Sequence, residues 1–244
     1  MKPIVDVVIP ALNNMTLTGT CATKAAAFAE WPFLITVIDD GSDPAFPPSG
    51  PYRTWRNDRN LGFTATANRG LSETDAEYVC ILNNDAMAYP GWLRKMMAHM
   101  LRHENLGMLI PTQLLPSVRT QALYNDGRVR LEFVSYAPMF CALLSRAAIN
   151  AIGVLDPKVG RDGLTDLDYC IRLGDAGFKV GIARDVYFDH IGRQSISKLP
   201  EWATGEYQRV NYQEKGPLVA KWGLERVNRL MAESMRPSYQ ETED

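Results

Sequence analysis

The chain alternates short, β-branched apolar runs with segments whose apolar residues recur at helical spacing. The runs 4–9, 33–38 and 78–82 are rich in Ile and Val and predict buried strands. Residues 17–28 and 63–71 carry apolar positions at helical spacing and predict helices between those strands. Strands joined through a helix pair in parallel. We therefore predict an α/β fold with a mixed, mainly parallel sheet flanked by helices.

The second half of the chain is less regular. It predicts strands at 107–111 and 178–183, strand-like or apolar runs at 133–136, 139–144 and 186–190, and a helix near 165–173. With 244 residues, one compact domain over 1–235 is the default, with halves 1–110 and 111–235. The polar, proline-containing tail 236–244 is expected to be disordered.

Three of the predicted strands end in polar or turn-forming residues. Pro10 closes the first strand, Asp39-Asp40 the second and Asn83-Asn84-Asp85 the third. In an open parallel sheet the carboxyl ends of the strands line one crevice, where ligands bind. We expect these three clusters to share one site. Asn13 or Asn14 is a suitable cap for the first helix, and Asn60 for the next.

Charge and composition exclude several classes of partner. The net charge is −2 and acids alternate with bases, so the chain has no electrostatic footprint for duplex nucleic acid or for a membrane surface. No apolar run approaches the roughly 18 residues of a membrane span, and no signal peptide opens the chain, which favours a soluble, cytoplasmic protein. The four scattered cysteines predict buried, reduced thiols.

Five strings in order resemble one known family. They are Val8–Asn13, Val37–Ser42, Asn57–Gly70 with Asn60-Leu61-Gly62-Phe63 at its core, Leu82–Asp85 followed by Pro90–Leu93, and Thr165–Leu173. Together they resemble the family 2 glycosyltransferases of the GT-A (Rossmann-like) fold, and most closely the rhamnosyltransferase-like branch. The resemblance spans residues 4–192. It implies a nucleoside-diphosphate sugar donor of the UDP or dTDP type, a divalent metal, Mn²⁺ or Mg²⁺, and inversion at the anomeric carbon.

The resemblance also implies roles for individual residues. Asp40 matches the carboxylate that contacts the nucleotide base, and the loop that cradles base and ribose matches Pro10, Ala11, Leu12 and Asn13. Asn83-Asn84-Asp85 falls where the family places its Asp-x-Asp motif, and His190 matches a histidine that completes the metal site. Metal binding at Asp85 and His190 is therefore expected, against the alternatives of a turn aspartate and a hydrogen-bonded histidine.

Amides stand where the family more often has acids. Asn83 keeps an acceptor oxygen but lacks the charge of an aspartate, so we expect Asn83 and Asn84 to orient the donor instead of binding the metal. Gly62 and Asn68 are weaker candidates for donor contact, since a tight turn and a helix face explain them equally well.

Two acids near a helix start are candidates for the general base. Asp166 matches the acid of the family's Glu-Asp pair, and Asp168 is the second candidate. Thr165 stands where Glu is usual. Two residues apart on a helix, the two acids cannot point the same way, so we prefer Asp166. The alternative for either is a charge that complements the helix dipole.

Several further side chains were open to two interpretations. His99 and His103 stand four apart on a predicted helix, which is metal spacing, but they are expected on a solvated face. An acceptor platform or lid, or core packing, would explain a C-terminal group of side chains, and core packing is preferred. The group is made up of Trp202, Tyr207, Tyr212, Lys215, Lys221 and Trp222.

The sequence thus predicts an inverting, metal-dependent glycosyltransferase. Two alternatives remain: a nucleotidyltransferase that makes a sugar nucleotide, and a non-catalytic module that binds one. The first would need a Gly-rich, basic loop after the first strand, which residues 10–14 do not provide. The acceptor stays open among a saccharide, a protein, a small molecule and a modified nucleic-acid base.

Overall fold

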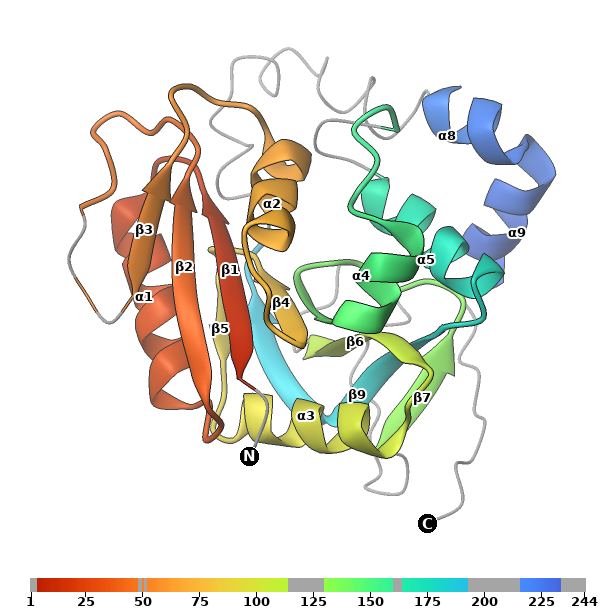
Figure 1. Ribbon diagram of the computed structural model, residues 1–244, viewed down its shortest axis with the longest axis horizontal. Coiled ribbons are helices and arrows are strands. Elements are labelled where there is room, and N and C mark those ends of the chain that lie inside the picture. The colour runs from red at the N-terminus through yellow and green to blue at the C-terminus, as the bar shows by residue number, and fades with distance from the viewer. Residues whose placement is uncertain are drawn as a thin grey trace.

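The computed structural model describes residues 4–47, 50, 52–113, 130–159, 164–192 and 216–233. One mixed sheet runs through these residues in the order β3-β2-β1-β4-β8-β6-β9-β5, and β7 pairs with β9 off that path (Figure 1). Its strands are β1 (Val5–Ala11), β2 (Phe33–Asp39), β3 (Arg53–Arg56), β4 (Tyr78–Leu82), β5 (Ala86–Ala88), β6 (Leu106–Gln113), β7 (Leu131–Val134), β8 (Cys141–Ser145) and β9 (Lys179–His190).

The first half of the sheet is parallel, as the strand–helix–strand pattern predicted. β1 pairs with β2 and β4, and β2 pairs with β3, all in parallel, so their carboxyl ends lie at one edge. β1 extends two residues beyond the predicted end and includes Pro10 and Ala11. Its pairing with β4 stops at Val8, so Pro10, which has no N–H, needs a ladder partner only on the β2 side.

The second half of the sheet changes direction. β8 is antiparallel to β4 and β6, and β9 is parallel to β6 but antiparallel to β5 and β7. The predicted mixed α/β sheet is confirmed, and parallel pairings make up half of those among the described strands. The runs predicted separately at 178–183 and 186–190 form one strand, β9. β3 and β5 were not predicted, because each is only three or four residues long.

The helices flank the sheet, and loops join most of them to the strands. They are α1 (Met15–Ala27), α2 (Phe63–Ser72), α3 (Trp92–Arg102), α4 (Arg146–Ile152), α5 (Thr165–Asp175), α8 (Gly216–Trp222) and α9 (Leu224–Glu233). Asn14 precedes α1 in a left-handed conformation without a side-chain cap bond. Gly62, not Asn60, is the N-cap of α2, and Asn60 Oδ1 instead accepts from the Gly62 N–H.

Two apolar clusters lie among the described residues. The large one lies between the sheet and its helices and includes all of the residues Val79–Leu82 of β4. The small one joins Leu167 and Ile171 of α5 to Leu218 of α8 and Val227 of α9, and Figure 1 shows these helices at the side away from β3. The terminal helices are therefore attached to α5.

Some predictions about single side chains change in the structure. His99 is buried and lies 2.8 Å from Asp185 on β9, so the expectation of a solvated face was wrong; the helix α3 packs this face against β9. All four cysteines are buried and free, as predicted. None of the helices in the described residues is long and apolar enough to cross a membrane. The tail 236–244 lies outside the described residues.

Candidate active site

The loops after β1 and β2 are hydrogen-bonded to each other. Asp40 N–H donates to the Ala11 carbonyl at 2.7 Å, and the Asn13 N–H donates to Ser42 Oγ at 2.8 Å. Asn13 Oδ1 in turn accepts from the Asp43 N–H. Leu12 and Asn13 thus lie in a loop whose shape is set by the next loop, whereas Pro10 and Ala11 lie inside β1.

The neighbouring acids Asp39 and Asp40 have different surroundings. The Asp39 carboxylate is buried and accepts from the N–H groups of Ser42 and Phe46 and from the Arg56 guanidinium. Burial alone would raise the pKa of Asp39, but these hydrogen bonds outweigh it and the pKa lies below its ordinary value. Asp39 therefore holds the loop after β2 in place.

Asp40 holds the start of α2. Its Oδ1 accepts from Asn57 Nδ2 and from the Leu61 N–H, and its Oδ2 accepts from the Gly62 N–H at 2.9 Å. A carboxylate oxygen can accept two hydrogen bonds, so Oδ2 is the atom with capacity left for a nucleotide base. Gly62 has φ +87°, a conformation that other residues rarely adopt.

Asn68 faces away from this loop. Its Nδ2 donates to the Leu155 carbonyl, and its Oδ1 accepts from the Leu155 N–H, both at 2.8 Å. Both ends of the amide are therefore occupied by one backbone unit of another segment. This arrangement gives Asn68 a structural role, and its contact with a donor stays a prediction.

The turn after β4 brings together the residues expected to bind metal. β5 pairs antiparallel with β9 in a register that sets Ala86 opposite His190, and the Ile191 N–H donates to the Asp85 carbonyl. As a result, His190 Nε2 lies 3.2 Å from Asp85 Oδ1. Asp85 is only 4% exposed. Two residues that are 105 positions apart in the chain thus meet because of a three-residue strand.

Two amides complete this turn in different ways. Asn84 Nδ2 donates to Thr18 Oγ1 of α1, so this side chain ties the turn to the helix. Asn83 Nδ2 lies 3.4 Å from His190 Nε2, and Asn83 Oδ1 is buried without a hydrogen-bond partner among the described residues. Sequence reasoning did not single out Thr18, which has no local signal for this contact.

The residues of this turn fit a divalent cation. A carboxylate, an imidazole nitrogen and a buried amide oxygen without a partner are all groups that Mg²⁺ or Mn²⁺ accepts as ligands. The described residues contain no group of three or more His, Cys, Asp or Glu side chains that could hold a metal.

The two acids of α5 differ in what surrounds them. Asp166 is partly buried; its Oδ2 accepts from the Tyr136 hydroxyl at 3.0 Å and its Oδ1 from the Leu167 N–H. Burial raises the pKa of Asp166 although both hydrogen bonds lower it. A raised pKa suits a group that must take a proton near neutral pH.

Asp168, in contrast, is fully buried and surrounded by donors. Its Oδ2 lies 2.8 Å from Arg172 Nε, and its Oδ1 lies 2.7 Å from Lys221 Nζ and 2.8 Å from Trp222 Nε1. Such a carboxylate cannot reach a substrate hydroxyl. The structure thus favours Asp166 over Asp168 as the candidate base. Lys221 and Trp222 were expected to pack in the core or to bind an acceptor, and in the structure both contact Asp168.

The segment 136–140 joins the turn after β4 to the start of α5. Tyr136 donates to Asp166, while the Phe140 carbonyl accepts from the Asn83 N–H and the Phe140 ring stacks on His190 at 4.9 Å. Four residues of chain span at most about 14 Å. The candidate base and the candidate metal ligands therefore contact the two ends of one short segment. Tyr136 was missed in the sequence, since its partner lies 30 residues away.

Comparisons with known proteins agree with this fold. Residues 6–149 match the family model described as glycosyl transferase family 2. The solved structure of GalNAc-T7 with UDP, GalNAc and Mn²⁺ is similar at 13% identity and a TM-score of 0.67, over 95% of this chain and 51% of that one. The mannosyltransferase PcManGT from Pyrobaculum calidifontis with GDP-Man and Mn²⁺ is similar at 16% identity and 0.59, over 78% and 57%.

The chain spans little more than half the length of either of these two proteins. At such low identities the likeness shows a shared fold. No curated protein matches the sequence.

Proposed function

Because this chain belongs to glycosyl transferase family 2, we propose that it transfers a sugar from a nucleoside-diphosphate donor to a hydroxyl acceptor, with inversion and with a divalent metal. The observation that carries the proposal is that the candidate metal ligands and the candidate base contact opposite ends of one short segment, residues 136–140. Asp85 and His190 meet at 3.2 Å on one side of residues 136–140, and Asp166 lies at the other end.

The donor would lie over the carboxyl ends of the parallel strands. Asp40 Oδ2 is the candidate contact for the base, and the loop with Leu12 and Asn13 is the candidate wall beside the ribose. The family resemblance favours a uridine or thymidine diphosphate. We also propose that the chain belongs to the rhamnosyltransferase-like branch of the family. The proposal further includes Mn²⁺ in preference to Mg²⁺ and inversion at the anomeric carbon.

Asp85 and His190 would hold the cation beside the diphosphate. Asn83 was expected from the sequence to orient the donor, but its buried, unpartnered amide oxygen makes it a candidate third ligand. A bound divalent ion offsets the negative charge that builds up on the leaving diphosphate. The Phe140 ring keeps the His190 imidazole in one plane by stacking at an interplanar angle of 13°, so the ring does not have to be ordered when the ion binds. Both structures named above contain Mn²⁺, which supports the choice of this ion.

Asp166 would take the proton of the acceptor hydroxyl as that oxygen attacks. Inversion needs the base on the face of the sugar opposite the leaving group, and Asp166 lies across segment 136–140 from the metal ligands. The Tyr136 hydroxyl fixes Oδ2, so the carboxylate keeps one orientation. The raised pKa makes the carboxylate a stronger base than an ordinary aspartate.

The acceptor is open among the four classes predicted from the sequence, so the first test uses water as the acceptor. The purified chain is incubated with UDP-glucose, UDP-galactose, UDP-N-acetylglucosamine or dTDP-rhamnose and Mn²⁺, and the released nucleoside diphosphate is measured with and without EDTA. The proposal expects metal-dependent release from at least one donor, absent in Asp166→Asn.

Two other outcomes would contradict the proposal. Binding of a sugar nucleotide without any release, with or without the acceptor candidates, would indicate a non-catalytic module. Formation of pyrophosphate from a nucleoside triphosphate and a sugar phosphate would indicate a nucleotidyltransferase.

A further inference from the structure

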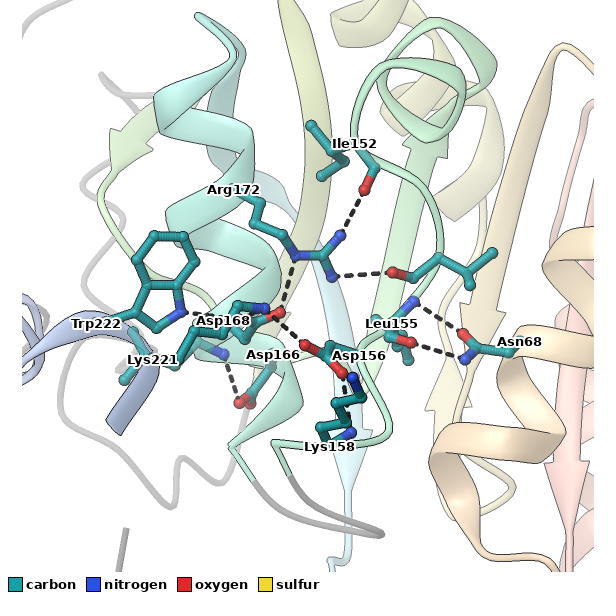
Figure 2. A network of polar contacts seen from close by, with 12 residues as sticks. Asn68, Ile152, Leu155, Asp156, Lys158, Asp166, Asp168, Arg172, Lys221 and Trp222 are labelled. Atoms are coloured by element: carbon teal, nitrogen blue, oxygen red, sulfur yellow. Dashed lines mark hydrogen bonds and ion pairs between the residues drawn. The ribbon is translucent and has the colours of Figure 1, made fainter. Parts of the chain in front are cut away.

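The first turn of α5 is held by a helix from the far end of the chain. Figure 2 shows Asp168 of α5 between Arg172 on its own helix and Lys221 and Trp222 at the end of α8. Both α8 contacts go to the same oxygen, Oδ1. The carboxylate is completely buried, so these donors replace all of the water it would otherwise bind.

The same contacts join other segments to α5. Lys221 Nζ also lies 2.7 Å from Asp156 Oδ2, and Arg172 donates to the carbonyls of Ile152 at 2.7 Å and Val154 at 2.9 Å. Next to Asp156, the backbone of Leu155 is bonded twice by Asn68 of α2 (Figure 2). The network therefore connects α2, the loop after α4, α5 and α8.

The charges of the network are balanced. Two carboxylates, Asp156 and Asp168, face two cations, Arg172 and Lys221. Burial lowers the pKa of the Lys221 ammonium, but its hydrogen bonds to Asp156 and Asp168 outweigh burial and leave the pKa above its ordinary value. Lys221 thus stays charged, and its removal would leave a fully buried carboxylate with one cation fewer.

Asp166 lies in the same helical turn as Asp168. Its own contacts, to the Tyr136 hydroxyl and the Leu167 N–H, do not fix the helix that carries it. The backbone of this turn begins at Leu164, which has a left-handed conformation and makes no side-chain cap bond. The contacts of Asp168 are therefore the polar anchor of the turn from which the candidate base projects.

We propose that Lys221 and Trp222 are positioning residues for the general base: by binding Asp168 they fix the first turn of α5 and keep Asp166 in its reactive place. The inference rests on the proposed function, since it assumes that Asp166 is the base. It gives the C-terminal helices a role in the reaction without any contact to the substrate.

The test compares two variants that each remove one anchor. Trp222→Phe keeps an aromatic ring but has no N–H to donate to Asp168. Lys221→Met keeps most of the apolar stem but loses the ion pairs with Asp156 and Asp168. We expect kcat for Mn²⁺-dependent release of UDP from UDP-sugar to fall by about tenfold or more in each, because small misplacements of a reacting group are costly. The KM for the UDP-sugar should stay within about twofold of the wild-type value.

Two further variants serve as controls. Lys221→Arg keeps the charge and should recover most of kcat. Asp175→Asn breaks the ion pair that ties Arg226 of α9 to the other end of α5, so it loosens the same helices away from the base. This variant should keep the wild-type kcat.

Hydrogen exchange tests positioning without any turnover. The amides of residues 165–169 should exchange faster in Trp222→Phe and Lys221→Met, while those of β1 and β4 should stay as in the wild type. Unchanged kcat and unchanged exchange at 165–169 in both variants would overturn the proposal. Faster exchange throughout the sheet would overturn it as well, because it would show a general loss of stability.

The same experiment separates this inference from the proposed function. If Asp166→Asn keeps full release of UDP, the base assignment fails whatever Lys221 and Trp222 do. If Asp166→Asn is inactive while both anchor variants match the wild type, only the positioning role fails.

Discussion

The turn after β4 and the first turn of α5 each carry a buried carboxylate, but their surroundings differ. Asp85 is close to one side chain, His190, and has beside it an amide oxygen without a partner among the described residues. Asp168 has two cations and an indole N–H within 2.8 Å. A buried carboxylate needs such partners, so the single side-chain partner of Asp85 among the described residues agrees with its proposed role as a metal ligand, whereas the protein itself satisfies Asp168.

The same contrast recurs between neighbours in sequence. Asp39 and Asp40 each accept three hydrogen bonds from the described residues, but one donor to Asp39 is the Arg56 guanidinium, while all three donors to Asp40 are neutral N–H groups. Asp166 has one hydroxyl and one backbone donor and a raised pKa. An Arg or Lys partner thus separates the carboxylates that hold the fold, Asp39 and Asp168, from those proposed to act on ligands. The predictions below test this difference.

The largest effect is expected at Asp166. Asp166→Asn should lower kcat for nucleoside diphosphate release by about 10³-fold, because the amide cannot take a proton. Donor binding, measured by calorimetry with UDP and Mn²⁺, should remain. The isosteric change Asp43→Asn, in the exposed loop after β2, is the control, and equal losses in both variants would contradict the assignment.

Asp168→Asn should act on stability first. It leaves Lys221 and Arg172 without their buried anion, which is expected to cost about 3 kcal/mol in the free energy of unfolding. For a chain of this size that corresponds to a fall of about 10 °C in melting temperature. Asp175→Asn, which breaks a half-exposed pair, should cost at most about 1 kcal/mol. Equal melting temperatures for the two variants would show that Asp168 is not an anchor.

His190→Ala should weaken the binding of Mn²⁺ in the presence of UDP by more than about tenfold. A roughly tenfold loss is typical when a residue that only supports a metal ligand is removed. The reason for the larger effect is the loss of a candidate ligand nitrogen next to Asp85. His103→Ala removes an imidazole that lies edge-on to Phe133 and should leave the affinity unchanged. Mn²⁺ titrations by calorimetry measure both, and unaltered binding by the His190 variant would remove it from the metal site.

Tyr136→Phe should have the smallest effect, a change in pH dependence. The Tyr136 hydroxyl lowers the pKa of Asp166, so its loss raises that pKa further. The acid limb of the kcat profile should then move to higher pH by about half a unit to one unit, since one hydrogen bond is worth about 1 kcal/mol. Tyr89→Phe, which loses a hydrogen bond to Asp189, is the control. A shift to lower pH would contradict the contact.

The regular parts of the fold were predictable from the sequence. β1, β2 and β4 are apolar runs rich in β-branched residues and are buried along almost their whole length, so these continuous runs located them. β5 escaped because three residues carry no period, although it is the strand that sets His190 against Asp85. Only the family resemblance connected these two residues in advance.

Contacts between distant segments were not predictable in the same way. Lys221 and Trp222 looked like core or platform residues, and their bonds to Asp168, more than 50 residues away, leave no local signal. His99 was expected in solvent because the helix period does not show which face a strand such as β9 will cover. Side-chain partners of this kind are decided by packing, not by propensity.

The most direct test of the central claim is the binding of Mn²⁺ by the turn after β4 in the presence of UDP. Electron paramagnetic resonance measures the Mn²⁺ that stays free in solution. The wild type and Asp189→Asn, which changes an acid one residue from His190, should both remove free Mn²⁺ from solution. Asp85→Asn should not. Equal binding by Asp85→Asn and the wild type would contradict the account, because the Asp85 carboxylate would then not be a metal ligand.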